Sequence, residues 1–261
     1  MIRSLALRTP TLPPATHTNC YVLGDERLTV VDPASPHPGE QRRLYDWLCG
    51  LGRVERIVLS HHHHDHVGGV EDLRARLGGV PVLGHARTRA RLLGQIEVDG
   101  LLDEGQLLHT DAGAWEVWHT PGHATGHLCF LQDQDVVCGD MVASEGTIVL
   151  EEPEGHLQDY LDSLERLEAR GGRLHPSHGG PIEDGAAKLR QYIDHRNART
   201  EQVRQALAAG ACRPLEIVEA VYGDTIPRIV YPLAARQVRC HLSWLANRDE
   251  VRLVDDTWSL A

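Results

Sequence analysis

Residues 60–66, which read Ser-His-His-His-His-Asp-His, constrain this chain more than any other feature. The run follows an apolar strand-like segment, residues 54–59, and precedes Gly68 and Gly69, so it is not placed as a purification tag would be. In an extended segment, side chains two residues apart point to the same side, so His61 and His63 can hold one cation together. Asp65 and His66 enter the next turn and can reach a second cation. Histidine nitrogen and carboxylate oxygen both bind zinc-like ions.

Three further candidate ligands follow later in the chain. His123 comes after a Pro-Gly turn, Asp140 after a glycine at the end of an expected strand, and His178 between a serine and a Gly-Gly pair. Each would be an ordinary surface or turn residue if it stood alone. Together with the histidine run they predict one metal centre of seven residues: His61, His63, Asp65, His66, His123, Asp140 and His178.

The remaining pattern predicts mixed strands and helices up to residue 185 and helices beyond it. Short β-branched or alternating runs favour strands at residues 3–8, 19–24, 28–32, 54–59, 80–83, 105–108, 115–118, 128–131 and 136–138. Helical apolar spacing covers residues 39–50, 70–77, 157–170, 186–209, 215–221 and 233–246. Residues 251–260 predict a hairpin. We therefore expect a core domain over residues 1–185 and a helical, winged-helix-like module over residues 186–261.

Composition limits the compartment and the partners. The 261 residues carry a net charge of −11 and six scattered cysteines without a C-x-x-C pair, which argues against a disulfide framework and against a cysteine zinc site. There is no apolar run of about 18 residues and no signal-peptide pattern at the N-terminus. We expect a cytoplasmic protein that does not enter a membrane.

The order H-x-H-x-D-H, Pro-Gly-His, Gly-Asp and Ser-His-Gly resembles the metallo-β-lactamase superfamily over about residues 1–185. The resemblance implies an α/β fold, the αββα sandwich, with the metals at one edge between two sheets. It also implies the distribution of the ligands: His61, His63 and His123 on the first metal, Asp65, His66 and His178 on the second, and Asp140 bridging both. The tail, including Tyr-Ile-Asp-His-Arg at residues 192–196, is similar to a lactamase-like group of endoribonucleases and thioester hydrolases.

This family implies a hydrolase that uses a metal-bridging hydroxide to cleave an ester, thioester or related acyl bond. Two divalent ions are expected, zinc first, although manganese and iron suit the same ligands. We expect catalytic roles for Asp65, which can orient the hydroxide, and for His127, which the family pattern places near the metals. His195 and Arg196 are expected on a solvated helix face, with the substrate groove as the alternative.

Three other functions remain open. An endoribonuclease acting on single-stranded RNA is opposed by the charge, because residues 186–261 carry only 11 Lys and Arg against 9 Asp and Glu. A persulfide dioxygenase with one iron is opposed by the seven candidate ligands, because such an iron site needs only three. A nucleic-acid-binding module without activity would not need an intact ligand set. The expected partners are a small acyl substrate, RNA as the alternative, and a second copy in a homodimer.

Overall fold

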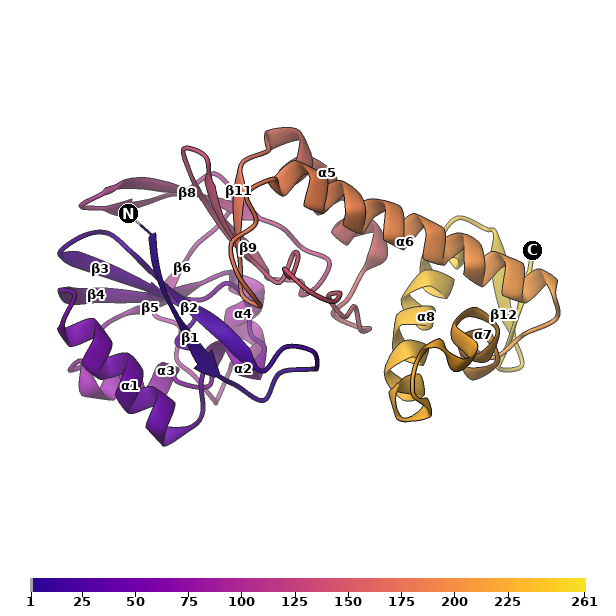
Figure 1. The fold of residues 1–261 in the computed structure, drawn as a ribbon, viewed down its shortest axis with the longest axis horizontal. Helices are drawn as coiled ribbons and strands as arrows, with labels where there is room; N and C mark the ends of the chain where they lie inside the picture. Colours follow the sequence, from indigo (N-terminus) through magenta and orange to yellow (C-terminus); the bar gives the residue numbers. More distant parts are fainter. Residues whose placement is uncertain (1) are drawn as a thin grey trace.

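Two β-sheets lie face to face in the computed structural model, which describes residues 2–261 (Figure 1). The first sheet has the strand order β1 (Ile2–Arg8), β2 (His17–Leu23), β3 (Arg27–Val31), β4 (Arg53–Val58), β5 (Val82–Gly84) and β6 (Gly100–Leu101). The second has the order β11 (Arg173–Pro176), β10 (Asp135–Gly139), β9 (Leu128–Gln132), β8 (Gly113–His119) and β7 (Leu107–Thr110).

Helices cover the outer face of each sheet. The first sheet packs against α1 (Pro38–Cys49) and α3 (Val70–Arg76), and the second against α5 (Leu157–Arg170) and the first half of α6 (Gly185–Ala208). The short helices α2 (His64–Val67) and α4 (Ala86–Arg91) connect strands of the first sheet. This order of layers confirms the expected αββα sandwich.

The strands explain this layering, because several are buried on both faces. In β2, Tyr21 and Leu23 pack between the sheets, whereas Cys20 and Val22 pack toward the helices. Side chains alternate along a strand, so an unbroken apolar run indicates a strand that is covered on both sides. Trp115 of β8, which is fully buried, fills the space between the sheets from the other side.

The C-terminal residues form a smaller lobe at the end of α6 (Figure 1). It consists of α7 (Pro214–Tyr222), two short 3₁₀ turns η1 (Gly223–Thr225) and η2 (Arg228–Val230), α8 (Tyr231–Ala246), and the hairpin of β12 (Val251–Val254) and β13 (Thr257–Leu260). Its helices and hairpin match the elements expected there. The division into two domains at residue 185 and the winged-helix likeness stay predictions.

The elements that were not expected from the sequence are α2, α4, β6, β11 and the two 3₁₀ turns η1 and η2. The helix α2 has only four residues, three of them polar, so it shows no apolar spacing. The strand β11 reads Arg-Leu-His-Pro and pairs in parallel with β10 at the sheet edge. Within residues 2–261, no helix combines the length and the apolar character that crossing a membrane requires.

Candidate metal centre

The histidine run lies at the point where β4 ends and α2 begins. His61 is fully buried, His63 is extended and precedes α2, and His66 is fully buried on that helix. His64 points to solvent. Because a four-residue helix follows an extended segment, the histidines of one run face different directions, and only some of them reach the interior.

His61, His63 and His123 form one group. The Nε2 atoms of His61 and His123 lie 3.0 and 2.9 Å from Nδ1 of His63. Burial and the neighbouring histidines lower the pKa of His61, and they lower the pKa of His63 to about 2. Burial lowers the pKa of His123 as well. Three imidazoles that favour the neutral form therefore direct nitrogen atoms to one point, as metal ligation requires.

Asp65, His66 and His178 form a second group, and Asp140 lies between the two. One oxygen of Asp140, Oδ2, lies 3.5 Å from Nε2 of His123 in the first group. The other, Oδ1, lies 3.4 Å from Nε2 of both His66 and His178. Asp140 thus offers one carboxylate oxygen to each group, which is the arrangement expected of a bridging ligand.

Two buried atoms indicate that this centre fits a divalent cation. Nε2 of His66 and Oδ1 of Asp140 have no hydrogen-bond partner among the described residues. Buried polar atoms are rarely left without a partner, and a bound cation would satisfy both. The donors are imidazole nitrogens and carboxylate oxygens, which suit zinc, manganese or iron. All seven predicted ligands are brought together here, and their role as ligands stays a prediction.

Asp32 hydrogen-bonds to residues of this centre from the side away from the pocket, and it was not predicted from the sequence. Its carboxylate accepts hydrogen bonds from Nδ1 of His66 at 2.9 Å, and from the backbone nitrogen and Oγ of Ser60 at 2.8 and 2.5 Å. Ser60 Oγ in turn accepts a bond of 3.0 Å from Nδ1 of His61. Such partners orient the imidazoles and fix their tautomers. A lone aspartate at the end of β3 resembles any turn residue in the sequence.

Backbone carbonyls hold two further histidines. Nδ1 of His123 donates to the carbonyl oxygen of Val149 at 2.8 Å, and Nδ1 of His178 donates to that of His17 at 3.0 Å. In both residues Nε2 is then left to face the centre. No side-chain pattern could have predicted these contacts, because the acceptors belong to the main chain.

His127 does not line the pocket beside the metal centre, and its expected catalytic role stays a prediction. It is fully buried, its Nε2 accepts the backbone N–H of Asp140 at 3.0 Å, and its Nδ1 lies 2.9 Å from Oγ1 of Thr120. Both ring nitrogens are therefore occupied by protein groups. This geometry favours a positioning role, in which His127 fixes the backbone that carries Asp140.

Arg196 departs from expectation. It is 2% exposed, and its guanidinium donates to the carbonyl oxygen of Ile148 and to Oε1 of Gln237, the latter at 3.0 Å. The prediction of a solvated helix face is therefore wrong for Arg196, although His195 is exposed. Neither residue lines the pocket.

The metal centre opens into a pocket of about 410 Å³. Five of the seven candidate ligands lie on its surface, while His61 and His66 lie behind it. Asp65 lies on this surface, so the structure leaves it available for its expected role beside the reacting water. The walls come from the loop between β1 and β2, from residues 143–151, and from Val230 and Leu233 of the C-terminal lobe.

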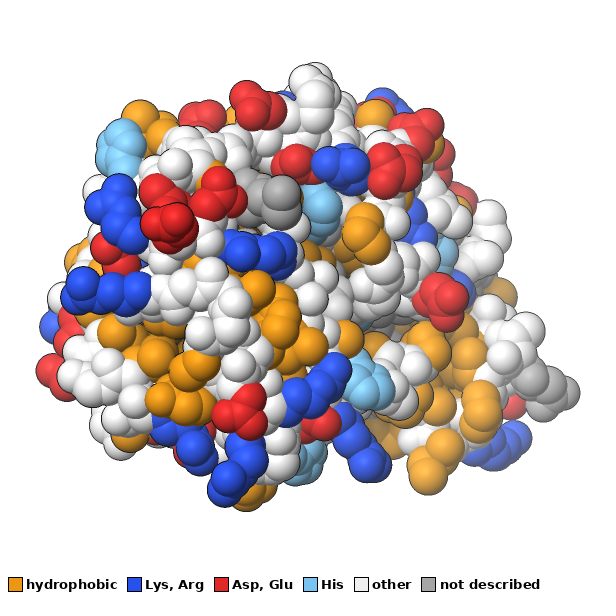
Figure 2. Space-filling view, turned by 60° about the vertical axis from the view of Figure 1, so that its left-hand side comes forward, with side chains coloured by type: hydrophobic (Ala, Val, Ile, Leu, Met, Phe, Trp, Pro, Cys, Tyr) orange, Lys and Arg blue, Asp and Glu red, His pale blue; other side chains and the backbone are white. Residues whose placement is uncertain are grey.

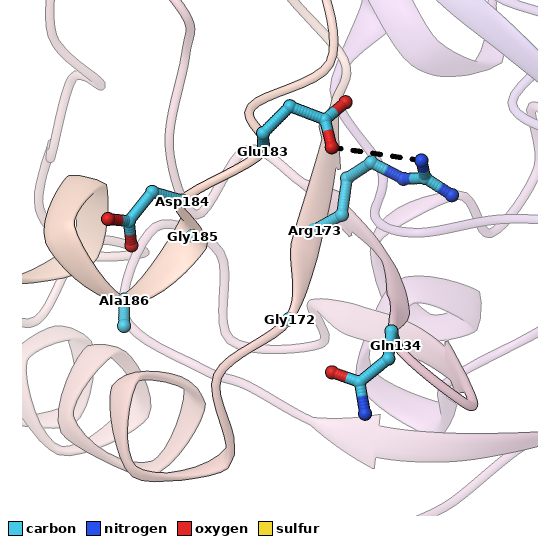
Figure 3. A pocket seen from close by; sticks show the side chains of 7 residues that line it. All are labelled: Gln134, Gly172, Arg173, Glu183, Asp184, Gly185 and Ala186. Carbon is cyan, nitrogen blue, oxygen red and sulfur yellow. Dashed lines mark ion pairs between the residues drawn. The ribbon is translucent and has the colours of Figure 1, made fainter.

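A second cavity of about 570 Å³ is unrelated to this centre (Figure 3). It lies at the start of β11 and of α6, and its charged lining includes Arg173 and Glu183, which face each other at 3.8 Å. None of the candidate ligands lines it. We therefore assign the chemistry to the histidine-lined pocket.

Comparison with known proteins decides the family. Residues 13–178 match the model of the metallo-beta-lactamase superfamily. The chain belongs to this superfamily. As a member, it is a hydrolase of the metallo-beta-lactamase fold.

The chain is also similar to individual members over most of its length. It is 33% identical over 251 residues to the Beta-lactamase-like protein 2 homolog of Drosophila melanogaster, covering 90% of this chain and 84% of the relative. It is 30% identical to the Atrochrysone carboxyl ACP thioesterase of Aspergillus fumigatus, covering 79% and 68%. A Beta-lactamase domain protein from Burkholderia ambifaria shares the fold with a TM-score of 0.88 at 22% identity, over 100% of this chain and 91% of that chain.

Proposed function

We propose that this metallo-beta-lactamase-fold hydrolase uses two divalent ions, zinc first, to cleave an ester, thioester or related acyl bond. The observation that carries the proposal is the position of Asp140, whose two oxygens face different groups of candidate ligands. A mononuclear iron site needs only three ligands, so a persulfide dioxygenase would leave the second group without a purpose.

Two bound ions would supply a hydroxide at neutral pH and stabilise negative charge on the substrate oxygen. The protein's own groups prepare that chemistry. Asp65 lies on the pocket surface, where its carboxylate can accept a hydrogen bond from the attacking water and orient it. His127 holds the backbone of Asp140, and Asp32 holds His66, so these groups are positioned before substrate binds.

The pocket favours an acyl substrate over RNA. Among the described residues, no Lys or Arg side chain lines it, and Glu145 and Glu151 do. Binding of a nucleic-acid backbone depends on basic side chains. On the face shown in Figure 2, basic and acidic side chains are interspersed without a continuous basic surface. The thioesterase named among the relatives supports the same choice.

The test is to measure the metal content of untagged protein and to assay the same sample on neutral thioesters and on single-stranded RNA. We expect about two ions per chain and thioester turnover, both reduced in Asp140→Ala. One iron per chain with oxygen uptake would contradict the proposal. If the protein binds two metals and cleaves RNA but no thioester, it is an endoribonuclease and the proposal of acyl hydrolysis is wrong.

A further inference from the structure

The pocket beside the candidate metal centre has two walls that come from segments far from the histidines. One wall is the loop of residues 10–15 between β1 and β2, which contributes Leu12, Pro13 and Pro14. The other comes from the C-terminal lobe, where Val230 ends η2 and Leu233 lies in the first turn of α8. The metallo-beta-lactamase model match ends at residue 178, so this second wall lies outside it.

Both walls are apolar and incompletely covered. Leu12 is 50% exposed, while Val230 and Leu233 are half-buried. Ile148 and Val149 continue the apolar surface between the C-terminal lobe and His123. An apolar group that enters the pocket would remove this surface from water, which is favourable in proportion to the area buried. A pocket of about 410 Å³ is at the small end of the range for small-molecule sites, roughly 300–1,000 Å³.

The wall from the C-terminal lobe is held in place by contacts with the segment that it faces. Arg236, one turn after Leu233, places Nη1 2.9 Å from both carboxylate oxygens of Glu151, a residue that also lines the pocket. Farther along α8, the thiol of Cys240 donates to the carbonyl oxygen of Leu150 at 3.4 Å. Because α8 is tied to residues 150–151 at two points, Leu233 has a defined place above the pocket.

The charged side chains of the pocket indicate which substrates it can bind. Outside the candidate ligands, its charged side chains are Glu145 and Glu151, and Arg236 pairs with the second. The pocket therefore offers apolar surface to the acyl group and no basic group to a phosphate. This combination fits a thioester or ester whose acyl part is uncharged.

We infer that Val230 and Leu233 are specificity-determining residues, which contact an apolar, uncharged acyl group and set the acyl length that the site accepts. The inference rests on the proposed function. The C-terminal lobe would then determine substrate specificity directly. A shorter side chain at Val230 or Leu233 would leave room for a longer acyl chain.

The test is a length series of acyl N-acetylcysteamine thioesters, which are neutral, assayed with wild type, Leu233→Ala, Leu233→Phe and Val230→Ala. One methylene in an apolar pocket changes kcat/KM by about tenfold or more. We expect the preferred chain to become longer in Leu233→Ala and Val230→Ala and shorter in Leu233→Phe, with metal content unchanged. Leu215→Ala and Leu253→Ala, which remove exposed leucines of the same lobe outside this pocket, are the matched controls and should keep the wild-type profile.

An active wild type whose length profile is the same in all three pocket variants would overturn this inference alone. A wild type that binds two metals and cleaves no thioester or ester of the series would instead overturn the proposed function, and the inference with it. If Leu233→Ala fails to fold, Leu233→Met and Val230→Ile conserve the packing and still alter the wall. A shift of the length profile in either conservative variant supports the inference, and an unchanged profile in both contradicts it.

Discussion

Arg196 reaches the carbonyl oxygen of Ile148, and the next carbonyl, that of Val149, accepts the Nδ1–H of His123. A buried arginine on α6 thus fixes the segment that orients a candidate metal ligand. We expect Arg196→Met to weaken binding of one of the two metals by about 10-fold, a typical effect of changing a group behind a ligand.

Chelator competition on the two sites would measure this effect, and Arg196→Lys, which keeps a donor for Ile148, should restore part of the affinity. The matched control is Arg190→Met, because Arg190 lies on the same helix and pairs with Glu168. A lower melting temperature in Arg196→Met with unchanged affinity for both metals would show a purely structural role.

The histidine run allows a test within six residues. His61 and His66 are buried at the centre, whereas His64 points to solvent. His61→Ala and His66→Ala should each lose metal and reduce turnover by more than about 100-fold. Mutating a residue that only hydrogen-bonds to a ligand already lowers metal affinity or activity by about 10–100-fold. His64→Ala should match wild type in metal content and rate. Equal metal loss in all three variants would mean that the run binds metal nonspecifically.

Asp32 should matter for metal binding, although less than a ligand does. It has a φ of 53°, which asparagine tolerates, so Asp32→Asn changes the carboxylate with little backbone cost. We expect metal affinity to fall by 10–100-fold and the metal-free protein to lose about 3 kcal/mol of unfolding free energy in urea denaturation. Asp133→Asn, at an exposed turn with a φ of 48°, is the control and should change neither quantity.

His241 should make the stability of the fold depend on pH. Burial, followed by Arg196 and Arg199, lowers its pKa from the ordinary 6.5 to about 3, and its Nδ1 lies 2.8 Å from Oγ1 of Thr200. The folded state keeps it neutral while the unfolded state takes up a proton below pH 6.5, so its contribution is complete above that pH and is lost toward pH 3.

The expected signature is a difference between wild type and His241→Gln that shrinks on acidification. Between pH 6.5 and about 3, the gap in unfolding free energy should narrow by about 1.4 kcal/mol per pH unit. Urea denaturation of metal-free protein at several pH values measures it. A gap that stays constant over this range would mean that His241 is protonated in the fold.

Much of the fold could be predicted because its strands and helices carry their own patterns. The helix at 157–170 and the hairpin at the C-terminus are visible from apolar spacing and from the Asp255-Asp256 turn, where both residues have positive φ. The strand β11 could not be predicted, because a four-residue segment with two polar side chains owes its conformation to pairing with β10.

The candidate ligands could be predicted for the same local reason, since each stands in a short motif. The residues behind them could not. Asp32 and Arg196 act through contacts with residues 28 and 48 positions away, Ser60 and Ile148, and nothing near them in the sequence marks the partner. Arginine side chains are usually exposed, so the sequence alone favours a solvated position for Arg196 and not the buried one that it has.

The ligands of the candidate centre come from the segments that follow β4 of the first sheet and β8, β10 and β11 of the second. Ions bound there would cross-link the two halves of the sandwich, much as a disulfide closes a long loop of chain. The free energy of metal binding would then count as folding free energy. By mass action, the supply of metal in the surroundings would decide how much of this protein stays folded, as well as how much of it is active.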